Sequence, residues 1–305
     1  MTLALSSLAA GGKPALAAAL ARLERAPEEE ATLALLDEAY RAPRAQVVGV
    51  TGPPGVGKST LTGALIAAWR GEKRSVGVIA VDPSSRASGG ALLGDRTRLR
   101  TDPEDAGIFV RSMAARDKLG GLAALTVSAM VLMRALFDRV VIETVGVGQS
   151  ETDVAGAADT VVLCVQPGSG DSLQFMKAGI VEIPHVVVIT KSDLGDAAER
   201  ARADATSVLG LAGHPAGGWE VPVLGVSALR HEGIDTLVAA IERHRQWLGP
   251  LLAEARATQA RHWLVEGLRE SWGREGLRRV GEPALAPGES PFRALARLGR
   301  TLGGA

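Results

Sequence analysis

The sequence holds one cysteine among its 305 residues, so a disulfide within the chain is excluded. That residue, Cys164, lies in the apolar run Thr160–Val165, and we interpret it as a small buried hydrophobic residue. No run of about 18 apolar residues is present, which argues against a membrane span. The N-terminus lacks a charged segment before its apolar stretch, so a secretion signal is not expected. These absences predict a cytoplasmic protein.

The chain also has no net charge, because Lys plus Arg and Asp plus Glu each number 34. Without an excess of one sign, nonspecific attraction to nucleic acid or to an anionic membrane is not expected. The histidines are scattered and do not have the spacing of metal ligands. They are His185, His214, His231, His244 and His262. Partners must therefore be inferred from local motifs.

The hydropathy pattern changes near Pro43. Residues 1–42 are rich in Ala, Leu and Glu at helical spacing and predict an N-terminal helical extension. Residues 43–248 alternate helical stretches with short apolar runs of the kind found in strands covered on both faces. This alternation predicts an α/β fold with a doubly wound, mostly parallel sheet. Residues 249–305 are expected to form C-terminal helices. The expected strands are Gln46–Val50, Val76–Val81, Ile108–Val110, Val140–Glu143, Thr160–Val165, Val186–Thr190 and Val223–Val226.

The segment Gly52–Ser59 matches the Walker A pattern of a phosphate-binding loop. It follows an expected strand and opens a helical stretch, which is the structural context that such a loop requires. Backbone N–H groups of the loop can curl around phosphates, while Lys58 supplies a positive charge and Ser59 offers a hydroxyl to magnesium. The predicted phosphate-binding residues are Gly52, Pro53, Pro54, Gly55, Val56, Gly57, Lys58, Ser59 and Thr60.

Two acidic residues end expected strands near this loop. The carboxylates of Asp82 and Glu143 should both lie at the carboxyl edge of the sheet, where open α/β folds bind ligands. Together they are suited to hold Mg²⁺, either directly or through its water molecules. Asp95 is a weaker candidate, since it depends on a loop folding over the ligand. The amide of Gly146 is expected to meet a terminal phosphate.

Two short motifs follow the sixth and seventh expected strands. The carboxylate of Asp193 can accept the N1–H and N2–H donors of guanine, whereas adenine presents an acceptor at N1. The stem of Lys191 can lie over the base, and the amide of Ala228 can donate to O6. Thr190 stands where asparagine is usual, and its hydroxyl is expected to tie neighbouring loops together with weaker support of the site. The predicted base-site residues are Thr190, Lys191, Asp193, Ser227, Ala228 and Leu229, with GTP or GDP and Mg²⁺ as ligands.

Hydrolysis by the free protein is expected to be slow. A Ras-type GTPase has an aspartate where Glu143 stands and a water-orienting glutamine directly after Gly146, where this chain has Val147. A valine side chain cannot orient the attacking water. Gln149 and Glu151 lie close by in the sequence, which does not indicate whether either one reaches the phosphate.

Several longer motifs resemble those of the MeaB-like GTPases associated with methylmalonyl-CoA mutase, once described as amino-acid transport ATPases or kinases. The likeness covers nearly the whole chain. Besides the Walker A loop, it rests on Val81–Ser85, Gly89–Arg96, Glu143–Glu151 and Pro167–Gln174 leading to Lys177. The Glu143–Glu151 string is long and unusual, which makes the resemblance specific.

The resemblance implies a GTPase chaperone of an adenosylcobalamin-dependent acyl-CoA mutase, which gates delivery of intact cofactor and release of damaged cofactor. It implies magnesium ligation by Ser59, Asp82, Asp95 and Glu143. It also implies a homodimer, with the C-terminal helices as the dimerisation arm. Isobutyryl-, ethylmalonyl- and methylmalonyl-CoA stay open as the substrate of the mutase.

A third switch, at Pro167–Lys177, is implied by the same resemblance, and we predict that it responds to the partner. The segment follows the fifth expected strand, and Gly168 and Gly170 give it the backbone freedom that a moving loop uses. Lys177, or an arginine of the earlier loops, could be brought toward the phosphates when the mutase binds. An ordinary turn with Asp171 as helix N-cap is the alternative. The predicted catalytic residues are Lys58, Glu143 and Lys177.

Two other functions could use the same nucleotide core. A metal-insertion GTPase for nickel needs a Cys/His cluster, for which Cys164 and the scattered histidines offer no equivalent. A kinase or ATPase acting on a small molecule or on a transport protein would use the same loop. It would also need an acceptor pocket and a base near the terminal phosphate.

Overall fold

A computed structural model describes residues 4–83, 99, 101–115, 124–144, 146, 150–168, 183–212 and 218–303. The chain divides into two compact units. One comprises Gln46–Leu122 and Arg139–Pro250 and contains the β-sheet, and we call it the sheet unit. The other comprises Met1–Ala45, Ala123–Asp138 and Leu251–Ala305, and we call it the helical unit.

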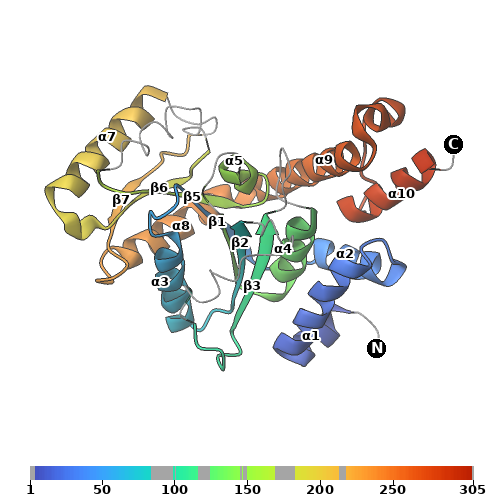
Figure 1. Ribbon diagram of the computed structural model, residues 1–305, viewed down its shortest axis with the longest axis horizontal. Helices are drawn as coiled ribbons and strands as arrows, with labels where there is room; N and C mark the ends of the chain where they lie inside the picture. Colours follow the sequence, from blue (N-terminus) through green and yellow to red (C-terminus); the bar gives the residue numbers. More distant parts are fainter. Residues whose placement is uncertain are drawn as a thin grey trace. The chain divides into compact units, whose positions relative to one another are not determined.

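The sheet unit is built on seven strands in the order β3-β2-β4-β1-β5-β6-β7 (Figure 1). Every pairing of neighbouring strands is parallel. The strands are β1 (Gln46–Thr51), β2 (Val76–Pro83), β3 (Ile108–Ala115), β4 (Arg139–Glu143), β5 (Thr160–Val165), β6 (Val186–Thr190) and β7 (Val223–Val226). Because all strands run the same way, the loops that follow them meet at one edge of the sheet.

Helices of the sheet unit cover both faces of its sheet. They are α3 (Lys58–Gly71), α5 (Ser150–Ala155), α7 (Asp196–Ala212) and α8 (Ile234–Leu248), with a 3₁₀ turn η2 (Ser192–Leu194). α3 and α8 share one core with the sheet, to which β5 contributes Val162 and Cys164. The next residue on the other face, Leu163, packs in a second core with Ala198 of α7. This two-sided cover explains why β1, β4, β5 and β6 are buried along their whole length and consist mainly of hydrophobic residues.

The predicted α/β fold with a parallel sheet is confirmed, and all seven expected strands are present. β5, β6 and β7 have the predicted bounds, whereas β3 continues to Ala115 beyond the apolar run at its start. It continues because β2 pairs with it as far as Pro83 opposite Ala115. Arg111 and Ser112 in this extension are polar, so hydropathy alone does not reveal it.

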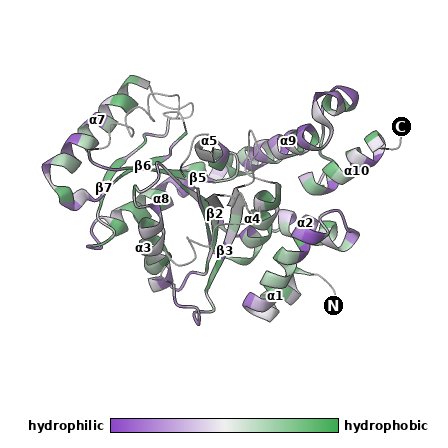
Figure 2. Ribbon diagram, in the orientation of Figure 1, coloured by the Kyte–Doolittle hydropathy of each residue, from purple (hydrophilic) through white to green (hydrophobic). Residues whose placement is uncertain are grey.

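The helical unit combines segments from both ends of the chain with one internal helix. Its helices are α1 (Leu5–Arg25), α2 (Glu30–Arg41), α4 (Ala124–Leu136), α9 (Leu252–Val280) and α10 (Pro291–Gly303). α9 is largely hydrophilic in Figure 2 and bends at Gly273, whose φ is 65°. α10 packs closely on α9. A Cβ atom at Gly299 would lie 2.5 Å from the Trp272 ring, so the absence of a side chain there allows this close approach. No helix among the described residues is long and apolar enough to cross a membrane.

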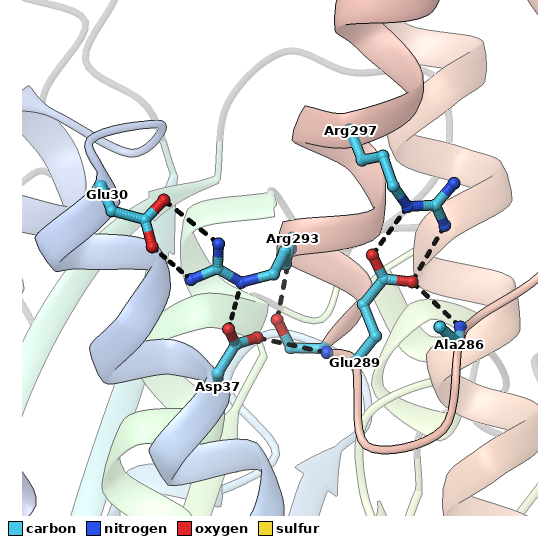
Figure 3. Close-up of polar contacts among 7 residues, drawn as sticks. Glu30, Asp37, Ala286, Glu289, Arg293 and Arg297 are labelled. Carbon is cyan, nitrogen blue, oxygen red and sulfur yellow. Dashed lines mark hydrogen bonds and ion pairs between the residues drawn. The ribbon is translucent and has the colours of Figure 1, made fainter.

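Charged residues also join the N-terminal and C-terminal helices of this unit (Figure 3). Arg293 of α10 donates to Glu30 of α2 at 2.9 and 3.1 Å, and its Nε donates to Asp37. Arg297, one turn further along α10, donates to Glu289 at 2.8 and 2.9 Å. Asp37 is buried, so its ion pair is the best shielded of these contacts.

Candidate nucleotide-binding site

The loop between β1 and α3 turns sharply at Gly52. The φ of this residue is 136°, a backbone conformation that residues with a side chain rarely adopt. A Cβ atom at Gly52 would lie 2.3 Å from the carbonyl oxygen of Cys164 in β5. Glycine therefore allows the loop to lie directly against the neighbouring strand at the carboxyl edge of the sheet.

Lys58 begins α3, and its ammonium group points back into the loop. Nζ donates to the carbonyl oxygens of Gly52 at 2.8 Å and Pro53 at 3.0 Å, and the residue is buried. The positive charge thus lies at the N-terminus of a helix, where the helix dipole also favours an anion. This arrangement is suited to bind phosphate oxygens. Thr60, on the same helix, is exposed.

Ser59 and Glu143 are brought together although they are far apart in the sequence. Ser59 Oγ donates to Glu143 Oε1 at 2.5 Å, and only 3% of Glu143 is exposed. Glu143 ends β4 opposite Val50 of β1, which places it beside the loop. The hydroxyl groups of Thr51 and Thr144 are hydrogen-bonded at 3.0 Å and hold the ends of these two strands together.

Gly146 lies against the phosphate loop. Its φ is 88°, and a Cβ atom there would lie 2.1 Å from the carbonyl oxygen of Gly52 and 2.6 Å from Lys58 Nζ. Any side chain at this position would therefore collide with the backbone of the loop. The backbone of residue 146 thus lies next to the ammonium group that is expected to bind a terminal phosphate.

The described part of the predicted magnesium site fits that ion. Ser59 and Glu143 offer a hydroxyl and a carboxylate oxygen, which are the hard ligands that Mg²⁺ prefers. Asp82 lies in β2, next to β4 in the sheet, but its side chain lies outside the described residues, and so does Asp95. Across the described part of the chain, no group of three or more His, Cys, Asp or Glu residues is close enough to hold a metal.

Thr190, at the end of β6, links this strand to the phosphate loop and to the end of β5. Its hydroxyl lies 2.7 Å from the carbonyl oxygen of Val56 in the phosphate loop and 3.2 Å from that of Val165 at the end of β5. The residue is 5% exposed, so water competes little for these contacts. The threonine thus ties neighbouring loops together in the way that a hydroxyl at this position was expected to do.

Lys191 follows in the left-handed backbone region, with a φ of 53°. Its ammonium group donates to the side-chain oxygen of Gln166 at 2.7 Å and to the carbonyl oxygen of Gly55 at 3.4 Å. Gln166 is not among the residues predicted from the sequence. Its position directly after β5, at the carboxyl edge where the ligand loops meet, is the feature of the sequence that could have indicated it.

Asp193 lies in η2 beside the loop that follows β7. The pKa of Asp193 is lowered below its ordinary value, mainly by the neighbouring Ser227 and to a smaller extent by Arg230. Arg230 Nε lies 3.8 Å from the carboxylate. The carboxylate is therefore ionised at neutral pH, as an acceptor for guanine N–H groups must be. In the same loop Ala228 is partly buried against the core, and Leu229 is exposed.

Several residues of the predicted switch and hydrolysis machinery lie outside the described residues. They are Lys177 with most of the segment Pro167–Lys177, and also Val147 and Gln149. The described residues bring together the phosphate loop, Glu143, Gly146 and the two base motifs at one edge of the sheet.

Most of the chain also matches a known protein family in sequence. Residues 15–273 match the sequence profile of the family described as methylmalonyl-CoA mutase-associated GTPase MeaB. The chain belongs to the MeaB family. The resemblance inferred from the motifs is thereby confirmed.

Individual relatives agree with this assignment. Over 207 residues the chain is 46% identical to a Pyrococcus abyssi protein provisionally named a GTPase, covering 67% of this chain and 64% of that protein. Over 230 residues it is 39% identical to the Mus musculus protein named methylmalonic aciduria type A homolog, mitochondrial, covering 73% of this chain and 55% of that protein. The chain spans less than two thirds of the length of both relatives.

A solved structure extends the likeness to the fold of the whole chain. The crystal structure described as a LAO/AO transport system kinase matches with a TM-score of 0.68 and 28% sequence identity. The match covers 98% of this chain and 96% of that chain. The chain thus shares the P-loop fold of that structure, and the match extends over nearly all of its residues.

Proposed function

We propose that this P-loop GTPase is a chaperone of an adenosylcobalamin-dependent acyl-CoA mutase, methylmalonyl-CoA mutase or a close relative. Its role would be to gate cofactor delivery and to protect or reactivate the mutase. Two findings support the mutase as partner: the family description names it, and the mouse relative is named after methylmalonic aciduria. GTP hydrolysis follows from membership of a family of GTPases with this fold.

One observation carries the choice of guanine nucleotide. The ionised carboxylate of Asp193 lies beside the loop of Ser227, at the same sheet edge as Lys58 in the phosphate loop. A carboxylate there can accept both the N1–H and N2–H donors of guanine, whereas adenine would present a lone pair to it. Sites of this kind discriminate strongly between bases, because the wrong base leaves polar groups of the site without hydrogen-bond partners.

Each residue around the phosphates has a distinct proposed role. Lys58 neutralises the negative charge that develops on the terminal phosphate, and the Gly146 amide donates a hydrogen bond to it. Ser59 and Glu143, with Asp82 and Asp95, would hold Mg²⁺, which supplies charge stabilisation at the phosphates when bound. Lys58 and the loop amides orient the phosphate chain, since phosphoryl transfer depends on positioning and electrostatics.

The partner would supply what the free protein lacks for fast hydrolysis. Val147 stands in the place of a water-orienting glutamine, and we propose that mutase binding acts through Pro167–Lys177 and its Lys177. We further propose a cytoplasmic homodimer, with residues 249–305 as the dimerisation arm. Residues 1–42 would serve as a helical extension of a GTPase domain at residues 43–248.

Phosphate release measured with and without the cognate mutase tests this function. The proposal requires GTP turnover that rises on addition of the mutase, and a mutase that co-purifies with the protein. Mass spectrometry of candidate acceptors after incubation with GTP separates hydrolysis from a kinase reaction. A phosphorylated acceptor, or turnover that no acyl-CoA mutase changes, would refute the chaperone role.

A further inference from the structure

Lys191 is held in place by contacts within the sheet unit itself. Its ammonium group lies 2.7 Å from the side-chain oxygen of Gln166 and 3.4 Å from the carbonyl oxygen of Gly55. Its backbone φ of 53° lies in the left-handed region, which lysine rarely adopts. Residues in such conformations are kept there by their surroundings, and they are concentrated at functional sites. Lys191 is exposed, so the protein restrains its backbone and offers its head group two acceptors at the surface of the sheet unit.

Gln166 is unlike the other acceptors around the base loop. Thr190 and Lys191 otherwise reach carbonyl oxygens, those of Val56, Val165 and Gly55. A backbone carbonyl is present whatever residue occupies the position, so these contacts do not depend on the identity of the acceptor. The contact at 2.7 Å depends on a side-chain oxygen at position 166. The identity of Gln166 thus determines the shorter of the two contacts that hold the ammonium group.

A carboxamide is well suited to this task chemically. It accepts a hydrogen bond from the ammonium group but carries no charge, so the lysine stays a net cation. A carboxylate at the same position would neutralise the lysine and place a negative charge near a loop that binds an anionic ligand. Restraining a long, flexible side chain before the ligand arrives also reduces the entropy lost on binding.

The geometry points to Gln166 as a positioning residue of the guanine site. It holds the Lys191 ammonium group so that the lysine stem lies across the face of the base. This inference rests on the proposed binding of guanine nucleotide. Gln166 thus affects nucleotide affinity through Lys191 and does not contribute to the chemical step.

The test compares nucleotide affinity and turnover in matched variants. Gln166→Leu removes the acceptor at similar volume, and Gln246→Leu makes the same exchange at an exposed position of α8 as a control. Titration calorimetry with GTP and GDP should show about five- to tenfold weaker binding of both nucleotides to Gln166→Leu. The turnover at saturating GTP should stay that of the wild type, so KM rises while kcat does not change.

A double-mutant cycle with Lys191→Met shows whether the effect passes through the lysine. In the Lys191→Met background, Gln166→Leu should cause no further loss of affinity. An equal loss in both backgrounds, or an affinity equal to that of Gln246→Leu, would overturn the inference. Competition with ATP on the wild type separates this outcome from failure of the guanine site, because a wild type that binds ATP as tightly as GTP refutes the site itself.

Discussion

Replacing Glu143 by glutamine tests the magnesium side of the site with little change of shape. The carboxylate is 3% exposed and accepts a hydrogen bond from Ser59 Oγ at 2.5 Å. The amide oxygen of glutamine can accept the same bond, so the main change is the loss of one negative charge. Any effect on turnover therefore reports on the charge and not on the packing of β4.

The expected loss of activity is large while the expected loss of stability is small. Removal of one group that stabilises charge at a reacting centre typically lowers kcat by about 100- to 1,000-fold. A buried carboxylate has a desolvation cost that a neutral amide largely avoids. We therefore expect turnover to fall by about 100-fold or more, with the free energy of unfolding within about 1 kcal/mol of the wild-type value.

Two measurements check this prediction. Phosphate release over a magnesium titration should show lower turnover and a higher magnesium requirement for Glu143→Gln, and urea denaturation should show nearly unchanged stability. Glu275→Gln, an exposed exchange on α9, is the matched control. Wild-type turnover at limiting magnesium would refute the role of Glu143. A loss of activity that parallels a loss of folding would instead make Glu143 a structural residue.

Three further outcomes are expected. Lys58→Ala should abolish turnover in a phosphate-release assay, since the buried ammonium group that points into the phosphate loop is removed. Asp193→Asn should weaken GTP binding and favour xanthosine triphosphate in competition binding, because the amide offers a donor where xanthine has a carbonyl. Burial lowers the pKa of His244 to about 3, so the free energy of unfolding should decrease as the pH falls below about 6.5, where the unfolded chain takes up a proton. Urea denaturation should show a smaller decrease for His244→Gln.

The fold could be predicted from the sequence because most of its strands are short runs of mainly apolar residues. β1, β4, β5 and β6 consist mainly of apolar residues, and this composition is typical of strands that are covered on both faces. Where polar residues follow such a run, the predicted strand ends earlier than the observed one. Arg111 and Ser112 lie in the extension of β3 that pairs with β2, and neither side chain indicates a strand. Pairing with a neighbour, which hydropathy does not encode, extends the strand.

The site was predictable wherever a motif lies within a short segment. Lys58, Ser59 and Asp193 each belong to such a motif, and the strands before them place them at one sheet edge. Gln166 was missed because its contact with Lys191 spans two loops separated in the sequence, and a lone glutamine after a strand has no distinctive spacing. The same holds for the hydroxyl pair of Thr51 and Thr144, which becomes visible only when β1 and β4 are side by side.

The strand order explains why a threonine can replace the usual asparagine of the base motif. β1 lies between β4 and β5, and β6 lies next to β5, so the phosphate loop and the base loop start close together. The short side chain of Thr190 therefore reaches the carbonyl oxygen of Val56 at 2.7 Å. This contact involves no atom of the base, so it sets the spacing of the loops and not the choice of nucleotide. Selection of guanine then depends on the carboxylate of Asp193, whose chemistry is unaffected by the exchange at position 190.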